Sequence, residues 1–182
     1  MIKAISLEKI FEDKKRGRVV AVDKASFEVK PGEIFGLLGL NGAGKTTTLR
    51  MLAGILKPNS GSALIDNIDV VSAPEKAKAR LGFMTGTTGL YARLKAVEMI
   101  KYFGRLYGMS NEQVSRRTDE LMAMLNLSEY AEVKCDKLSS GNKQKVSIAR
   151  TMIHDPQVII LDEPTAGLDV VAGRSVVVLR SA

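Results

Sequence analysis

The feature that most constrains this chain is a glycine-rich stretch, GLNGAGKT, at residues 39–46. It follows EIFGLLGL, a short apolar run typical of a buried strand, and it precedes KTTTLRMLAGIL, whose apolar residues recur at helical spacing. The pattern G-x-x-x-x-G-K-[ST] in this context predicts a strand that turns through a tight loop into a helix. We therefore expect an α/β fold built around this unit.

The residue types in this loop indicate that it binds phosphate. The candidate nucleotide-binding residues are Gly39, Asn41, Gly42, Ala43, Gly44, Lys45, Thr46 and Thr47. The three glycines allow the backbone to turn tightly and approach a ligand, and the backbone N–H groups then point at phosphate oxygens beside the helix N-terminus. We expect Lys45 to place its charge between the β- and γ-phosphates, and the Thr46 hydroxyl to ligate Mg²⁺. The alternative, a glycine-rich turn with a chance Lys-Thr, is weak beside this strand and helix.

Two adjacent carboxylates, Asp162 and Glu163, follow a second apolar run, QVIILDE. Asp162 ends the expected strand, so it should lie near the phosphate loop and hold Mg²⁺ through water. Glu163 points elsewhere because side chains alternate along a strand, and it suits a general base that polarises an attacking water. With Lys45, Glu163 forms the predicted catalytic set. The alternative, a pair of exposed carboxylates at a strand end, is weak once a phosphate loop is present.

The remaining pattern predicts an α/β core that is divided by a helical insertion. Strands are expected at residues 2–8, in VVAVDKASFEV and in SALIDNIDV, with a short helix opened by Pro74. From about residue 95 the pattern is helical, with Val97, Ile100, Phe103 or Gly104, and Tyr107 on one face. Further helices are expected over residues 111–126 and in SGNKQKVSIARTMIHDP.

We therefore predict one domain, residues 1–182, with a P-loop NTPase-type core sheet and an N-terminal antiparallel β region. Residues 1–84 and 151–182 would form the α/β core, and residues 85–150 an α-helical subdomain.

A third motif, Leu138-Ser139-Ser140-Gly141-Asn142, completes a recognisable set. Together with GLNGAGKTT and VIILDEPTAGLD, it resembles the ATP-binding-cassette (ABC) transporter family over essentially the whole chain. The resemblance implies that two cassettes pair head to tail, with Ser139 and Gly141 of one subunit closing on the ATP held by the other. A helix that begins there would direct its dipole and N–H donors at the γ-phosphate. A serine helix cap alone is the alternative for this segment in isolation.

The same resemblance implies an ATPase subunit that works with ATP and Mg²⁺. Such a subunit is cytoplasmic and peripheral on the cytoplasmic face of the cell membrane, and its ATP hydrolysis drives a solute through a membrane-spanning permease subunit. The stretch TGTTGLYARLKAVEMIKYFGRLYGM is most similar to the sodium-exporting branch. Phe11 is the candidate for the aromatic side chain that stacks on adenine near the N-terminus. A soluble cassette ATPase outside transport is an alternative.

Composition limits the kinds of partner and the compartment that we expect. The formal charge of +7 suits an anionic partner, but the basic residues are spread along the chain with few aromatics among them, so we expect no nucleic-acid partner. The single cysteine, Cys135, excludes an internal disulfide and suits a reducing compartment. The chain has no run of eighteen apolar residues and no signal-peptide pattern at its N-terminus.

Three internal positions depart from the family pattern. Ser140 and Asn142 replace the usual glycine and glutamine of the signature. Gly86 stands where a glutamine usually touches Mg²⁺, which predicts weaker Mg²⁺ coupling, since Thr85 and Thr87 reach less far. Lys95 replaces a helix-capping threonine with Glu98 three residues on, which predicts a weaker helix start.

The fourth departure is at the C-terminal end. The family places a further strand and a switch histidine after the glutamate, whereas His154, the single histidine, precedes it and is assigned to the dipole at a helix C-terminus. We therefore expect a C-terminally truncated cassette, with a gap of unpaired backbone between the strands that lead to Lys45 and Asp162. A truncated cassette that binds ATP without hydrolysing it is a further alternative.

Overall fold

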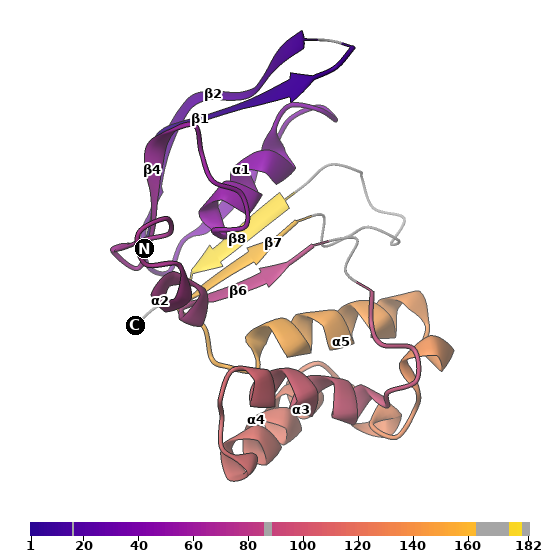
Figure 1. Cartoon of the computed structure of the whole chain (residues 1–182). Coiled ribbons are helices and arrows are strands. Elements are labelled where there is room, and N and C mark those ends of the chain that lie inside the picture. The colour runs from indigo at the N-terminus through magenta and orange to yellow at the C-terminus, as the bar shows by residue number, and fades with distance from the viewer. Residues whose placement is uncertain (16, 86–88, 163–174, 180–182) are drawn as a thin grey trace.

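The computed structural model describes residues 1–15, 17–85 and 89–162, and the backbone of 175–179. This part of the chain forms two four-stranded sheets with helix α1 beside them, and a separate layer of helices (Figure 1). None of the helices in these ranges is long and apolar enough to cross a membrane.

The first sheet is antiparallel and has the strand order β2-β1-β4-β5. Its strands are β1 (Ile2–Asp13), β2 (Gly17–Val29), β4 (Ser60–Ile65) and β5 (Ile68–Asp69). Strands β1 and β2 form a long hairpin in which Ile2 pairs with Val29 and Asp13 with Gly17. The expected N-terminal antiparallel region is therefore present.

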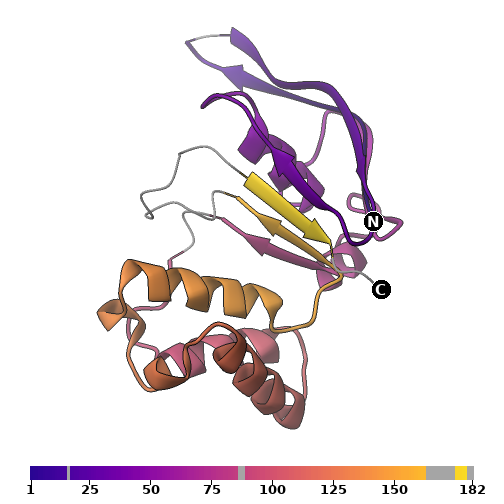
Figure 2. The same cartoon turned by 180° about the vertical axis from the view of Figure 1, so that it is seen from behind.

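The second sheet has the order β3-β8-β7-β6. Its strands are β3 (Ile34–Leu37), β8 (Ser175–Leu179), β7 (Val158–Leu161) and β6 (Leu81–Met84). Strands β6 and β7 are parallel, whereas β8 runs antiparallel to both β3 and β7 (Figure 2). The expected gap between β3 and β7 was wrong, because β8 pairs with both strands there. Its three consecutive valines favour a strand over a helix.

Helix α1 (Lys45–Leu52) packs against β1, β2 and β4 and supplies the middle of the main core. It ends four residues earlier than the leucine pattern predicts. Gly54 adopts φ +65° and donates its N–H to the Met51 carbonyl at 3.1 Å, a left-handed C-terminal turn that glycine allows. The short helix α2 (Pro74–Ala79) begins at Pro74, as expected.

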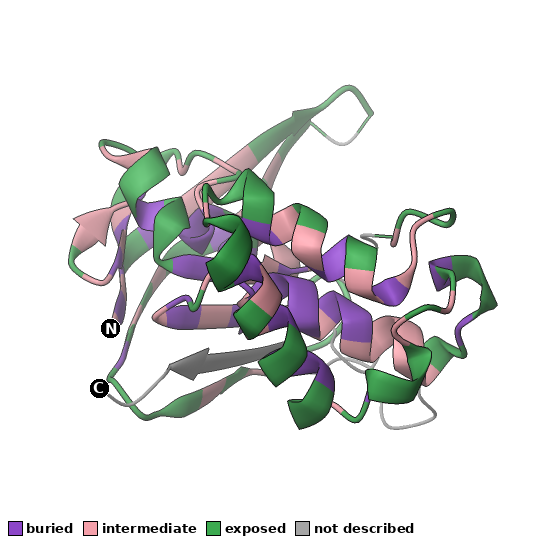
Figure 3. Cartoon of the chain, turned by 90° about the horizontal axis from the view of Figure 1, so that it is seen from below, coloured by how far each residue is buried: buried purple, intermediate pink, exposed green. Residues whose placement is uncertain are grey.

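The helical layer has a core of its own (Figure 3). It comprises α3 (Ala96–Leu106), α4 (Asn111–Met124), α5 (Ser140–Met152) and the 3-10 turns Ser128–Tyr130 and Cys135–Lys137. The buried face of α3 consists of Ala96, Met99, Ile100 and Gly104. Ile100 and Gly104 of the predicted face are confirmed, whereas Val97 is only partly buried and Tyr107 lies past the end of α3 and is exposed. Gly104 allows close packing, because a Cβ there would lie 3.0 Å from Val114 of α4 and 3.1 Å from Ile153, the residue after α5.

Candidate nucleotide-binding site

The glycine-rich loop turns directly into α1. Gly42 and Gly44 both adopt φ +83°, which favours glycine, and Gly44 is the residue before the first helical residue, Lys45. A Cβ at Gly44 would overlap the Ala21 carbonyl oxygen of β2, so the loop lies directly against that strand. The first-turn N–H groups of α1 have no carbonyl partner within the helix and are the natural donors to an anion.

A cavity of about 240 Å³ lies at this loop. It is lined by Ala21, Asn41, Gly42, Gly44, Lys45, Thr46 and Thr47. A second hollow of about 350 Å³ adjoins the same helix end, between β2 and the loop. Except for Ala21, all lining residues of the first cavity were named from the sequence pattern. Ala21 was missed because its place depends on how β2 packs on the loop.

Lys45 is 8% exposed, and its ammonium group is held by the loop itself. Its Nζ donates to the carbonyl oxygens of Gly39 at 2.7 Å and Leu40 at 2.9 Å. A buried ammonium needs such acceptors. The charge therefore lies inside the curve of the loop, where phosphate oxygens can replace the two carbonyls as its partners.

Thr46 and Asp162 meet at the edge of the same cavity, although 116 positions separate them. The Thr46 hydroxyl donates to Oδ1 of Asp162 at 3.2 Å, and the Asp162 side chain is 4% exposed. The strand end is fixed by the neighbouring β6, since the Asp162 N–H donates to the Met84 carbonyl at 2.8 Å. A hydroxyl and a carboxylate are the oxygen donors that Mg²⁺ prefers, and Mg²⁺ commonly takes few protein ligands beside substrate phosphates. The pair thus fits the expected metal.

The signature segment forms the start of α5. Ser139 precedes the helix, and its Oγ accepts from the Asn142 N–H at 3.2 Å. A Cβ at Gly141 would meet no atom within 4 Å, so space is open on that side of the first turn. Helix α5 lies in the helical layer, on the other side of the second sheet from α1 (Figure 1). Within this chain, Ser139 therefore acts as a helix cap, and its contact with the ATP of a second subunit stays a prediction.

Phe11 lies on β1, opposite Val19 of β2, and is 40% exposed. The Lys9 ammonium lies 5.4 Å from its ring centroid. Its ring is therefore accessible to a flat ligand, and its adenine role stays a prediction. Glu163 and Gly86 lie outside the described residues, so the predictions of the general base and of weaker Mg²⁺ coupling also stay open.

Two other predictions concern helix ends. His154 follows the end of α5, as expected, and its ring contacts the next strand: its Nε2 lies 3.1 Å from the Leu81 carbonyl of β6, and burial lowers its pKa. Its interaction with the helix dipole stays a prediction. Lys95 precedes α3 without a side-chain cap, because an ammonium group has no acceptor. The other half of the capping box is present, since the Lys95 N–H donates to Glu98 Oε2 at 2.9 Å. The Lys95 ammonium instead pairs with Glu132 at 2.6 Å.

Comparison with known proteins agrees with this geometry. Residues 22–166 match the family model for ABC transporters. The chain is 43% identical over 171 residues to the ABC transporter ATP-binding protein NatA of Bacillus subtilis, covering 93% of this chain and 69% of that protein. It is 44% identical over 170 residues to the uncharacterized ABC transporter ATP-binding protein MJ1023 of Methanocaldococcus jannaschii, covering 93% of this chain and 58% of the relative.

Solved structures give the same result. The dimeric structure of MJ0796, a bacterial ABC transporter cassette, matches with a TM-score of 0.79 at 28% identity, over 93% of this chain and 76% of that one. A dimeric post-hydrolysis state of the same cassette, bound to ADP and Pi, matches equally well.

The fold and the loop define a P-loop ATPase cassette, and the fold class predicted from the sequence is confirmed. The chain belongs to the ABC transporter family, as a cassette of its ATP-binding subunits.

Proposed function

We propose that this chain binds and hydrolyses ATP as the cytoplasmic subunit of a transporter, by in-line attack of water on the γ-phosphate. The observation that carries the proposal is the Thr46–Asp162 contact at the rim of the phosphate cavity. It places a hydroxyl and a carboxylate from two distant segments beside the loop that holds Lys45. We also propose that residues 1–84 and 151–182 form the α/β core of one domain, and that residues 85–150 form its helical subdomain.

The proposed roles follow from position. Gly39, the loop N–H groups from Asn41 to Thr47 and the Lys45 ammonium would hold the β- and γ-phosphates. Thr46 and Asp162 would hold Mg²⁺, directly or through water; when bound, Mg²⁺ neutralises charge on the phosphate oxygens. Glu163 would accept the proton of the attacking water. Phe11 would stack on adenine.

We propose a second cassette as one partner of this chain. The dimeric MJ0796 structures, which share this fold, support pairing of two such chains. In a head-to-tail pair, Ser139 and Gly141 of one chain would face the γ-phosphate held by the other. The exposed α5 N-terminus and the open space beside Gly141 suit this contact.

A groove at the junction of core and helical layer suits the proposed membrane-spanning subunit. Its volume is about 420 Å³, and its walls are Ala53, Ile55, Glu75, Lys78, Ala79, Leu81, Phe83, Leu106 and Tyr107. Ile55 is 60% exposed and Leu106 63% exposed, and neighbouring exposed apolar side chains indicate a protein-binding surface. Docking there would hold the chain on the cytoplasmic face of the membrane. Sodium is the proposed solute, on the resemblance of residues 85–109 to the sodium-exporting branch.

Phosphate release by the 182-residue chain with Mg²⁺-ATP tests the hydrolysis. We expect release by the wild type and its loss in Lys45→Met and Glu163→Gln. Glu163→Gln should keep the rise in melting temperature that ATP causes, whereas Lys45→Met should lose it. ATP binding by the wild type without phosphate release would establish the non-hydrolysing alternative.

The transport role is tested separately in cells. The wild-type chain should be recovered with membranes, and Ile55→Glu or Leu106→Glu should move it to the soluble fraction without loss of ATP binding. A wild-type chain that stays soluble in the presence of its permease would favour the soluble cassette outside transport.

A further inference from the structure

The polypeptide passes between the sheets and the helical layer at two places. It leaves β6 at Met84 to reach α3, and it returns from α5 at Met152 to begin β7. The last turn of α5 contacts the connection from β6 to α3, and the residues just after this turn form the start of the connection to β7. This turn therefore sets how the helical layer is held on the nucleotide-binding core.

Arg150 belongs to that last turn and is 5% exposed. Its Nη1 donates to the Gly89 carbonyl at 3.2 Å, and its guanidinium carbon lies 5.2 Å from the centroid of the Phe103 ring on α3. Burial lowers the pKa of this guanidinium, so the protein bears a desolvation penalty to keep a cation here. A plain packing role would be met by an apolar side chain of similar size.

The segment that begins at Gly89 is attached to the helical layer along its length. The Cys135 N–H donates to the Leu94 carbonyl at 2.8 Å, and the Asp136 N–H donates to the Ala92 carbonyl at 3.2 Å. We call residues 89–95 the strap. Arg150 binds the strap at its first residue, Gly89, five positions after β6 ends at Met84.

The same turn of α5 rests directly on β6. A Cβ at Gly82 would lie 2.5 Å from the Thr151 carbonyl oxygen, so the absence of a side chain there allows helix and strand to touch. His154 adds its contact with Leu81. The C-terminal end of α5 is therefore anchored on the strand next to the one that leads to Asp162. Its other end, Ser139, lies eleven residues or about 16 Å away along the axis.

We propose that Arg150 is a positioning residue, which ties the strap to the anchored end of α5 and so fixes the direction in which α5 presents Ser139 and Gly141. Helix α5 also packs against α3 and α4. The contacts of Arg150 with Gly89 and Phe103 join the strap and α3 to the anchored end, and so restrain the angle at which α5 leaves it. The consequence for ATP rests on the proposed function, because it requires Ser139 to act on a second subunit.

Hydrogen exchange of the 182-residue chain tests the restraint without requiring activity. In Arg150→Met we expect about tenfold faster exchange at the hydrogen-bonded amides of Leu94, Cys135, Asn142 and Lys143. Exchange in the phosphate loop, reported by the Ala43 and Thr48 amides, should stay at the wild-type rate. Unchanged exchange at the strap and α5, or an equal rise at all of these amides, would overturn the proposal.

Two further variants separate the restraint from general destabilisation. Phe103→Leu keeps an apolar side chain but removes the cation–π partner, and should accelerate the same strap and α5 amides to a smaller degree. Arg116→Met removes an exposed arginine of α4 and should change none of them. Equal exchange in Arg150→Met and Arg116→Met would also count against a positioning role.

The functional arm measures ATP affinity and ATP-driven pairing. Arg150→Met should bind a fluorescent ATP analogue with wild-type Kd, while dimer formation and phosphate release fall about tenfold. A Kd that worsens in step with turnover, or wild-type turnover, would contradict the proposal. If the wild type neither pairs nor releases phosphate, the proposed function fails, and hydrogen exchange still decides the role of Arg150.

Discussion

The imidazole of His154 stacks face to face on the phenol ring of Tyr107, with centroids 3.6 Å apart and planes 6° apart. Its Nε2 lies 3.1 Å from the Leu81 carbonyl, and a carbonyl can only accept, so Nε2 carries the proton. The Nδ1 atom is buried and makes no hydrogen bond with the described residues. The end of α3, the end of α5 and the start of β6 thus meet around one neutral ring.

This environment predicts a pH dependence of stability. Burial lowers the folded-state pKa of His154 below its ordinary value of 6.5, although the Leu81 carbonyl and nearby Asp155 oppose the shift. The unfolded chain then binds a proton first as pH falls, so stability should be full above pH 6.5 and should decrease below it toward the folded-state pKa. Urea unfolding at pH 7.5 and at pH 5.5 measures this.

A His154→Gln variant is the control for this pH effect, because it keeps a donor to Leu81 but does not titrate. Its unfolding free energy should change less than that of the wild type between the two pH values. Since the chain has no other histidine, equal pH dependence in both proteins would assign the effect to the carboxylates.

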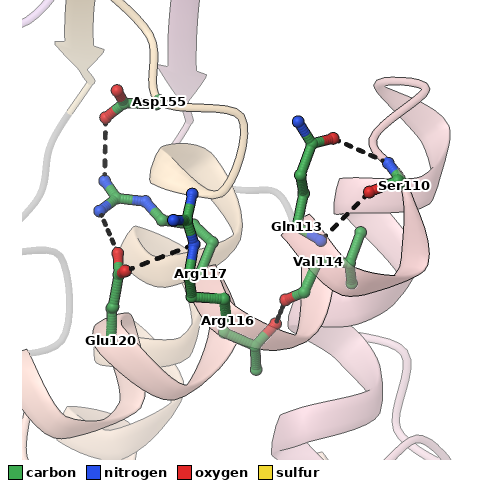
Figure 4. A network of polar contacts seen from close by, with 8 residues as sticks. Ser110, Gln113, Val114, Arg116, Arg117, Glu120 and Asp155 are labelled. Atoms are coloured by element: carbon green, nitrogen blue, oxygen red, sulfur yellow. Dashed lines mark hydrogen bonds and ion pairs between the residues drawn. The ribbon is translucent and has the colours of Figure 1, made fainter.

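The neighbouring Arg117 predicts a second stability effect. Its Nη2 donates to Asp155 at 3.1 Å and its Nη1 to Glu120 at 3.0 Å, which ties α4 to the turn between α5 and β7 (Figure 4). The Arg117 side chain is only 20% exposed, whereas that of Arg116 is 77% exposed. We expect Arg117→Met to lower the free energy of unfolding by about 1–2 kcal/mol.

Arg116→Met is the matched control, because its ion pair with Glu120 is long, at 3.9 Å, and solvated. Its loss should stay below about 0.5 kcal/mol. Urea unfolding of both variants at pH 7.5 compares them, and equal losses would mean that the Asp155 contact adds no stability.

These contacts show what the sequence could and could not reveal. The start of α4 at Asn111, the Pro74 start of α2 and the phosphate loop were predictable, because each depends on residues within one turn. The place of β8 between β3 and β7, and the partners of His154, depend on segments far apart in the chain. No local pattern encodes them. Thr46 and Asp162 were predictable together because strand ends and their following loops gather at one edge of a parallel sheet.

The two left-handed glycines of the phosphate loop give a matched pair of substitutions. Gly42 and Gly44 share φ +83°, but a Cβ at Gly42 would meet nothing within 4 Å, whereas one at Gly44 would overlap Ala21 of β2. Gly42→Ala should therefore cost only backbone strain, about 1–2 kcal/mol. Gly44→Ala should cost more and should abolish the ATP-induced rise in melting temperature. Equal behaviour of the two variants in thermal unfolding would show that the contact with β2 does not shape the loop.

The Thr46–Asp162 pair predicts how ATP binding depends on Mg²⁺. Thr46 lines the cavity and Asp162 accepts a hydrogen bond from its hydroxyl, so removing either oxygen should weaken binding of Mg²⁺-ATP about 10- to 100-fold. Thr46→Val and Asp162→Asn are close in size to the originals, and binding of ATP in EDTA should stay near the wild-type level because the loop N–H groups and Lys45 remain. Thr46→Ser keeps the hydroxyl and should retain the Mg²⁺ dependence. Titration of a fluorescent ATP analogue, with and without Mg²⁺, measures each variant. Loss of binding in EDTA as well would mean that the pair supports the loop rather than the metal.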